Sequence, residues 1–199
     1  MIFVDTTKTN RYTEPEKTIT SLCAKEEKSS MKSGYVIGID AGGTKVAYGL
    51  FNPAGERIDR AQHPTDVCAT GESFSDTLVE NIQAILARNN MKDTDLDGIG
   101  ICMPSFILFD EGYVLMTSAM PGIKQFPMRD YLKARLNTNI VLDNDSNAAA
   151  LAEYRRGAGR GSKHLVYITA GTGLGSGILI DGKLFRGSYG WAGECGHML

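Results

Sequence analysis

The sequence predicts an α/β protein made of two related halves, of which the second is incomplete. Residues 35–51 and 164–185 share one plan, in which a strand leads through a glycine-rich turn into a second strand. The copies lie about 130 residues apart, and internal duplication explains them economically. Between them, amphipathic and short apolar segments predict alternating helices and strands. The chain reaches Leu199 soon after the second copy, so we expect a complete first domain and only the start of a second.

Composition and charge are those of an ordinary globular chain. Of the 199 residues, 42% are hydrophobic and 22% are charged, with a formal net charge of -2. This charge gives no basic surface for nucleic acid, and no apolar run approaches the ~18 residues of a membrane-spanning helix. Because the start is polar and lacks the pattern of a secretion signal, we expect a cytoplasmic protein with neither a nucleic-acid nor a membrane partner. The four cysteines are widely spaced, which favours reduced thiols over disulfides.

The chain divides into three predicted regions. Residues 1–34 are rich in Thr, Lys and Glu with little apolar periodicity, so we predict a flexible N-terminal tail. This tail is too short and patternless for a helix-turn-helix. Residues 35–142 are predicted to form an N-terminal α/β domain, and residues 143–199 the start of a second α/β domain.

The expected elements follow from periodicity and turn residues. After the 35–51 hairpin, a turn at 52–55 leads into a strand at 57–63. The clearest helix spans 73–89, with Ser73 or Ser75 as its cap. Its apolar face comprises Phe74, Leu78, Ile82, Ile85 and Leu86. Further expected elements are strands at 96–103, 113–116 and 139–142, a short helix at 128–136, and a helix at 147–156 capped by Ser146.

The first glycine turn carries the residue types of a phosphate site. Gly42 and Gly43 permit positive φ and let backbone N–H groups approach an anion, while Thr44 and Lys45 add a hydroxyl and a cation. Asp40 suits such a site when Mg²⁺ lies between its carboxylate and the phosphate. An ordinary hairpin turn would also fit this pattern. The segment is not a P-loop, because no GxxxxGK[ST] motif opens a helix here.

The second glycine turn, at 169–177, could complete a nucleotide clamp. Gly171, Thr172 and Gly173 lie at its tip, where N–H groups and a hydroxyl can donate to phosphate oxygens. Two such turns facing each other across a cleft would hold phosphates better than one. The alternative is a flexible hairpin.

Asp143, Asn144 and Asp145 follow a predicted strand and precede a predicted helix. This is the usual place for catalytic groups in an open α/β sheet. A carboxylate here could accept the proton of an attacking hydroxyl, and Asn144 could hold the acceptor. The structural alternative is that Asp143 or Asp145 simply caps the helix.

Glu194 and His197 place a carboxylate and an imidazole three residues apart. Either side chain could hydrogen-bond a polyol, and His197 could ligate a metal. Taken alone this pair is a weak motif. His63 and His164 are assigned only structural roles.

Four motifs in order resemble those of the ROK family (repressor, open reading frame, kinase). They are DAGGTK at 40–45, NDSNAAALAE at 144–153, TAGTGLGSG at 169–177 and GECGHM at 193–198, and the resemblance covers residues 35–199. It implies the actin-like (ribonuclease H-like) ATPase fold, with the N-terminal domain complete and the second domain incomplete. It further implies ATP-dependent phosphorylation of a hexose or amino-hexose hydroxyl, with ATP and Mg²⁺ as cofactors, impaired in this truncated chain.

The resemblance also implies roles for individual residues. Asp145 would be the general base, and Asn144, Glu194 and His197 would contact the sugar. Asp40 would organise Mg²⁺, while the two glycine turns would hold the ATP phosphates. In full-length relatives a cysteine cluster completes a Zn²⁺ site with the histidine corresponding to His197, and a homodimer is expected there; those cysteines do not follow His197 in this sequence.

Two departures from the family pattern concern the sugar. The usual GxPG turn here ends Met103-Pro104-Ser105, and Ala119 to Ile123 replace an Asn-Leu-Pro-Gly-Trp-like segment. Both segments lie near the sugar in relatives, so the sugar is left open. A non-catalytic remnant and a ROK-type sugar-responsive transcriptional regulator are the alternative functions.

Overall fold

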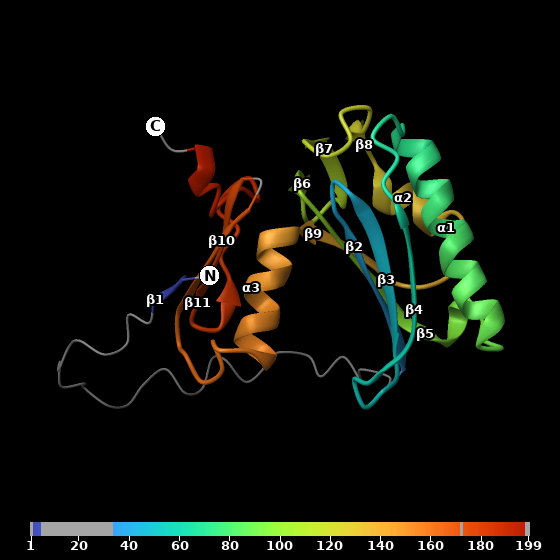
Figure 1. Ribbon diagram of the computed structural model, residues 1–199, viewed down its shortest axis with the longest axis horizontal. Helices are drawn as coiled ribbons and strands as arrows, with labels where there is room; N and C mark the ends of the chain where they lie inside the picture. The colour runs from blue at the N-terminus through green and yellow to red at the C-terminus, as the bar shows by residue number, and fades with distance from the viewer. Residues whose placement is uncertain (1, 5–33, 172, 198–199) are drawn as a thin grey trace.

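The computed structural model describes residues 2–4, 34–171 and 173–197, which form two lobes (Figure 1). The first lobe is a mixed sheet with helices α1 and α2 on one face. Helix α3 lies between the two lobes, where it packs on the second sheet and also contacts β5 and β9 of the first. Every helix in the described ranges is too short or too polar to cross a bilayer.

The first sheet has five strands in the order β4-β3-β2-β5-β9. Its first three strands are antiparallel, and β5 and β9 run parallel to β2. The predicted strand at 96–103 is confirmed, while the strand predicted at 139–142 begins and ends later. The bounds are β2 (Tyr35–Ala41), β3 (Lys45–Phe51), β4 (Arg57–Pro64), β5 (Leu96–Met103) and β9 (Ile140–Asn144).

Helix α1 (Gly71–Arg88) covers the first sheet with the predicted apolar face, whose five members are all buried. The expected cap was wrong, because Thr70 caps the helix and forms a capping box with Ser73. Ser75 is instead fully buried within the helix. The start of α1 packs against β8, since a Cβ on Gly71 would lie 2.3 Å from the Phe126 ring.

A small three-stranded sheet completes the first lobe. Its strands are β6 (Ser105–Leu108), β7 (Tyr113–Thr117) and β8 (Lys124–Phe126), in that order. Only β7 was predicted, because the two others are three or four residues long and have little sequence pattern of their own. Helix α2 (Met128–Lys133) ends three residues before its predicted end, and a short 3₁₀ helix, η1, spans Asp93–Asp95.

The second sheet repeats the opening plan of the first. Strands β10 (Leu165–Ala170), β11 (Leu174–Ile180) and β12 (Lys183–Leu184) form an antiparallel meander like β2, β3 and β4. The other edge of β10 pairs with β1 (Ile2–Val4), also antiparallel. These three residues were expected to be part of a flexible tail, but backbone pairing with β10 orders them. Residues 5–33 of that predicted tail lie outside the described residues.

Helix α3 (Asp145–Arg156) begins two residues before its predicted start. Ser146 is not the cap: the Asn144 side-chain oxygen accepts the N–H groups of Ser146 (2.8 Å) and Asn147 (3.3 Å). Strand β9 therefore passes directly into α3, and the chain crosses here from the first sheet to the second. The division into domains at 142/143 remains a prediction.

Candidate active site

Three adjacent strands carry Asp40, Cys102 and Asp143 in one row, each one residue before the end of its strand. In the strand register, Cys102 of β5 pairs with Asp40 of β2 on one side and with Asp143 of β9 on the other. The Cys102 thiol donates to the Ile39 carbonyl (3.4 Å) and lies 3.9 Å from Asp40 Oδ1. The carboxyl ends of the parallel strands thus form an acidic edge, as open α/β sheets commonly do at their sites.

The electrostatic environment of Cys102 shows which carboxylates gather at this edge. Burial raises the pKa of Cys102 to about 12, and the negative charges of Asp40, Asp145 and Asp143 act in the same direction. The thiol therefore stays protonated at neutral pH. Sequence reasoning had given Cys102 no part in the site.

Asp145 is the first residue of α3 and is partly buried. Burial raises its pKa above the ordinary value, helped by the charge of Asp40, while hydrogen bonds from the Ser146 N–H (2.8 Å) and hydroxyl (3.4 Å) to Oδ1 oppose the rise. A carboxylate at this position is a stronger base than an exposed one. Capping, the structural alternative, falls to Asn144 rather than to Asp145.

Asp143, by contrast, is held in a polar network. The Arg186 guanidinium donates to Asp143 Oδ2 from Nη2 (2.6 Å) and Nε (3.2 Å). Asn147 Nδ2 donates to the other carboxylate oxygen (3.0 Å). Arg186 also stacks over the Phe109 ring, 3.6 Å from its centre. The network joins the segment after β12 to the end of β9 and leaves Asp145 as the better candidate base.

Arg186 was missed in the sequence because nothing near it in the chain marks it as a partner. It lies in a loop, 43 residues after Asp143, and no sequence pattern over that separation predicts a contact between the two side chains. Only the fold brings the two together.

Asn144, the expected sugar ligand, is partly engaged within the protein. Its oxygen caps α3, and its Nδ2 donates to the Ser105 carbonyl (3.3 Å). An amide nitrogen has two N–H groups, so a second hydrogen bond from Nδ2 is still possible. The contact also ties Asn144 to β6, which follows the altered GxPG turn.

The first glycine turn is closed and braced by backbone contacts. The Gly42 N–H donates to the Lys45 carbonyl (3.0 Å), and the Thr65 hydroxyl donates to the Gly42 carbonyl (2.6 Å). Gly43, Thr44 and Lys45 are exposed at the tip. Positive φ is not the reason for its glycines, because neither Gly42 nor Gly43 adopts it. Their benefit is an uncovered backbone that an anion could approach.

The glycines of the second turn serve two different purposes. Added Cβ atoms at Gly171 and Gly173 would meet nothing within 4 Å, so the tip is open. A Cβ at Gly177 would lie 2.6 Å from Ala150 Cβ, and one at Gly175 would lie 2.3 Å from Ser146 Oγ. The later pair therefore allows α3 to pack on β11. Thr172 lies outside the described residues.

Glu194 lies in a segment packed tightly on β11. The Ser176 hydroxyl donates to the Gly193 carbonyl (2.5 Å), and a Cβ at Gly193 would lie 2.5 Å from the Ser176 carbonyl oxygen. Gly193 has φ of 96°, which favours glycine. His197 ends the 3₁₀ helix η2 (Cys195–His197), and its side chain lies outside the described part of the chain.

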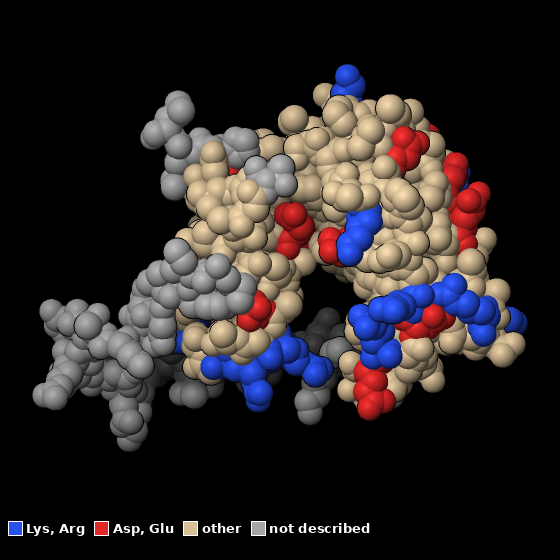
Figure 2. Space-filling view, viewed as in Figure 1, with Lys and Arg blue, Asp and Glu red and all other residues tan. Residues whose placement is uncertain are grey.

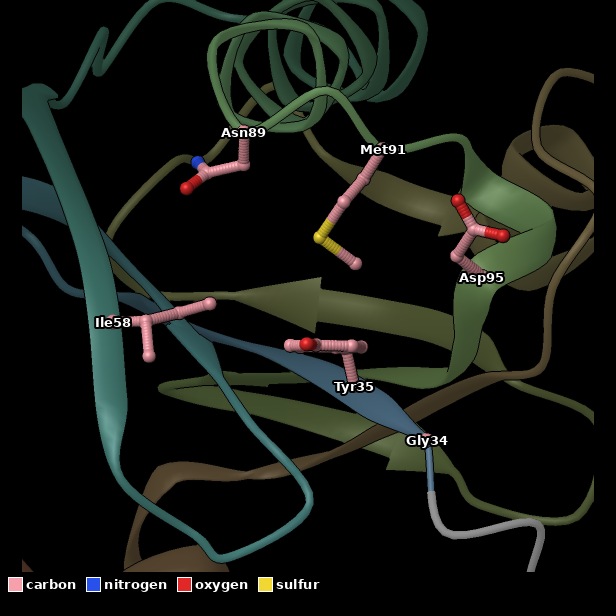
Figure 3. Close-up of a pocket in the computed structure, with 6 residues that line it drawn as sticks. All are labelled: Gly34, Tyr35, Ile58, Asn89, Met91 and Asp95. Carbon is pink, nitrogen blue, oxygen red and sulfur yellow. The ribbon is translucent and has the colours of Figure 1, made fainter.

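The figures place these parts relative to one another. The tips of the β2–β3 and β10–β11 hairpins lie at the same end of the two lobes (Figure 1). Figure 2 shows acidic side chains at the hollow between the lobes. The groove of Figure 3, about 410 Å³, lies at the opposite, amino end of β2 and is lined by Gly34, Tyr35, Ile58, Asn89, Met91 and Asp95. It is thus separate from the acidic edge.

Two sheets with repeated hairpins, glycine tips at the same end and an acidic edge between them define a protein of the actin-like ATPase fold. The chain belongs to the ROK family, whose model matches residues 36–199. A ROK family glucokinase from Streptomyces griseus, solved with glucose and AMPPNP, is 36% identical with a TM-score of 0.67, covering 83% of this chain and 50% of that one.

Curated relatives include both enzymes and regulators. Glucokinase of Halalkalibacterium halodurans is 34% identical over 168 residues, which are 84% of this chain and 51% of that protein. A xylose repressor of Bacillus spizizenii is 29% identical over 84% of this chain and 43% of the repressor. The chain spans about half the length of the relatives it matches, in agreement with an incomplete second domain.

Proposed function

We propose that the protein containing this chain phosphorylates a hydroxyl group of a hexose or amino-hexose with ATP. The observation that carries the proposal is the position of Asp145, a carboxylate of raised pKa at the start of α3, beside the acidic edge and between two glycine turns. The glucokinase relatives support the same reaction.

Asp145 would accept the proton of the attacking sugar hydroxyl. Its raised pKa favours this role, because a base is most effective when its pKa approaches the working pH. Asn144, Glu194 and His197 are proposed to hold the sugar hydroxyls. Positioning and charge neutralisation are then expected to supply most of the rate enhancement.

The two glycine turns are proposed to hold the ATP phosphates. Gly42, Gly43, Thr44 and Lys45 would contact them from the first lobe, and Gly171, Thr172 and Gly173 from the second. The exposed tips and the open space at Gly171 and Gly173 leave room for an anion.

Asp40 fits a role in holding Mg²⁺, because carboxylate oxygens suit this hard cation. No group of three or more potential metal-binding side chains lies together in the described ranges, so phosphate oxygens and water would have to complete the shell. When bound, Mg²⁺ neutralises charge on the phosphates. A Zn²⁺ site with His197, a homodimer, a cytoplasmic location and the lack of a nucleic-acid partner remain predictions for the longer protein.

The proposal is tested by turnover and binding together. We would measure ADP formation and calorimetric sugar binding with glucose, mannose, fructose, N-acetylglucosamine and N-acetylmannosamine. We expect little or no turnover from the 199-residue chain, because it spans only half of its relatives' length. The longer protein that contains it should phosphorylate at least one sugar, and a lack of both binding and turnover there would contradict the proposal.

Asp145→Asn is the decisive variant in the longer protein. It should lower kcat by about 10²–10⁴-fold and leave sugar binding largely unchanged, since an amide cannot take the proton. Asp110→Asn, at an exposed turn position, is the matched control. Equal turnover of Asp145→Asn and wild type would remove Asp145 from the base position.

A sugar-responsive regulator is the second candidate, favoured by the likeness to the xylose repressor. The presence of Asp145 at the proposed base position favours the kinase. A regulator would bind sugar without turnover, and the longer protein would bind a specific DNA sequence. A non-catalytic remnant would bind sugar or a partner, or nothing, and would show neither turnover nor specific DNA binding.

A further inference from the structure

Two exposed aromatic side chains and one half-buried one form a patch that bridges the two lobes. Phe106 belongs to β6, and Tyr189 and Trp191 belong to the segment between β12 and η2. We call these three residues the aromatic patch. The ring centres of Phe106 and Trp191 are 5.3 Å apart with an edge-to-face angle of 76°. Those of Tyr189 and Trp191 are 5.9 Å apart. Trp191 is 41% exposed and Tyr189 is 72% exposed, which is unusual for such large rings.

The backbone holds this patch in place. Gly190, between the two exposed rings, has φ of 83°, and a Cβ there would lie 2.7 Å from the Ile107 carbonyl oxygen. The loop therefore packs directly on β6. The Ala192 N–H donates to the Arg186 carbonyl (3.0 Å), closing the loop at its base. A braced loop that keeps large rings in solvent is suited to binding.

The aromatic patch adjoins the proposed acceptor site on both sides. Phe106 directly follows Ser105, whose carbonyl accepts from Asn144 Nδ2. Trp191 lies three residues before Glu194, whose N–H donates to the Trp191 carbonyl (3.4 Å). Backbone contacts thus connect the segments that carry the patch to those that carry two of the proposed sugar ligands.

We propose that the aromatic patch, with Trp191 at its centre, is a stacking wall for the pyranose ring of the acceptor. This inference rests on the proposed function and names a specificity element for it. A pyranose presents an apolar C–H face that an aromatic ring covers well, while hydroxyls at its edge suit Asn144 and Glu194. Binding sites for small molecules commonly combine such apolar walls with a few polar groups.

Trp191 is the only tryptophan of the chain, so its fluorescence reports directly on the patch. We would titrate the 199-residue chain with glucose, N-acetylglucosamine and N-acetylmannosamine, with mannitol as an open-chain control. The expected result is a saturable change in emission with the Kd that calorimetry gives for the same sugar. Mannitol should cause no change.

Variants then separate stacking from mere proximity. Trp191→Ala should weaken calorimetric sugar binding about three- to tenfold, the range expected for an aromatic contact. Trp191→Phe should recover most of that loss, and circular dichroism melts of both show whether the fold is kept. Phe185→Ala, which removes an exposed aromatic outside the patch, is the matched control and should bind like wild type.

Three results would overturn the inference. If sugar binds but Trp191 emission and the affinity of Trp191→Ala do not change, the stacking wall is wrong while the proposed function stands. If no sugar binds to the 199-residue chain, the stacking wall is wrong, while binding and turnover of the longer protein still decide the proposed function. If emission instead depends on protein concentration without sugar, and Trp191→Ala abolishes a dimer in sedimentation, the patch is a contact between copies.

Discussion

Asp143 and Asp145 lie two residues apart, yet their surroundings fit them for different tasks. Asp143 accepts from Arg186 and Asn147 and helps to join the lobes. Asp145 has no cation of this kind beside its carboxylate among its described contacts, and burial raises its pKa. Sequence reasoning located the pair but could not separate their roles, because both roles depend on residues distant in the chain.

The raised pKa of Asp145 has a consequence for stability. Its folded-state pKa lies above the ordinary value of 3.8, so ionisation of Asp145 destabilises the fold as the pH rises above 3.8, and this cost is complete once the pH exceeds the folded pKa. Asp145→Asn keeps an acceptor for Ser146 and removes the charge. We expect this variant to melt at a higher temperature than wild type at pH 7.

That difference should shrink as the pH falls through the folded pKa towards 3.8, because wild-type Asp145 then becomes protonated. Thermal melts of the 199-residue chain between pH 4 and pH 8 measure it, with Asp110→Asn as the control. A stability gain independent of pH would mean that burial of the charge is not the cause.

The sequence predicted secondary structure best for long elements with a continuous apolar pattern. The apolar face of α1 and the buried strand β5 are examples. The predicted helix caps were wrong, because capping depends on side-chain contacts that the periodic pattern does not contain. Thr70 caps α1, where Ser73 or Ser75 was expected, and Asn144 caps α3, where Ser146 was expected. Strands β6 and β8 exist through pairing with β7, which local sequence does not encode.

Most candidate site residues were found from local sequence motifs. Local patterns marked both glycine turns and the Asp143 to Asp145 segment. Cys102 and Arg186 were missed, because their relation to that segment arises from strand register and from a long-range ion pair. The aromatic patch was missed because Phe106 and Trp191 meet only across the lobes.

Packing of α3 on β11 depends on glycine. Gly177→Ala would place a Cβ 2.6 Å from Ala150 Cβ and 2.7 Å from the Ser146 carbonyl oxygen. We expect a loss of about 1–3 kcal/mol in the free energy of unfolding, measured by urea denaturation. Gly173→Ala is the matched control, because its Cβ would meet nothing within 4 Å. Equal stability of the two variants would show that the helix can move without cost.

The ion pair of Arg186 and Asp143 joins β9 to the segment after β12. Both side chains are largely buried, with 26% and 16% of their surfaces exposed. A double-mutant cycle with Arg186→Met and Asp143→Asn should give a coupling of about 1.5–3 kcal/mol, as expected for hydrogen bonds to a charged group. Each variant and the double variant would be unfolded in urea. Additive effects would mean that the pair does not couple the lobes.

At the scale of the whole molecule, the two sheets differ at one edge. In the first sheet, β2 lies between β3 and the parallel strand β5, and its lobe has a large buried core. In the second, β10 lies between β11 and the three-residue strand β1, and the buried cluster that the structure describes there has three hydrophobic members. If the two sheets are superimposed on their repeated hairpins, β1 lies beside β10 where β5 lies beside β2. A short antiparallel pairing thus protects this edge.

Loss of β1 should therefore promote self-association of the 199-residue chain. A chain beginning at Met31 lacks β1, so the N–H and C=O groups along the edge of β10 become available to another molecule. Sedimentation velocity at several concentrations should show larger species than for the full chain. Replacing Ile2, Phe3 and Val4 by proline controls for chain length, because proline cannot donate backbone hydrogen bonds. If both variants sediment like the full chain, pairing of β1 with β10 does not limit association, and the protection must come from another part of the chain.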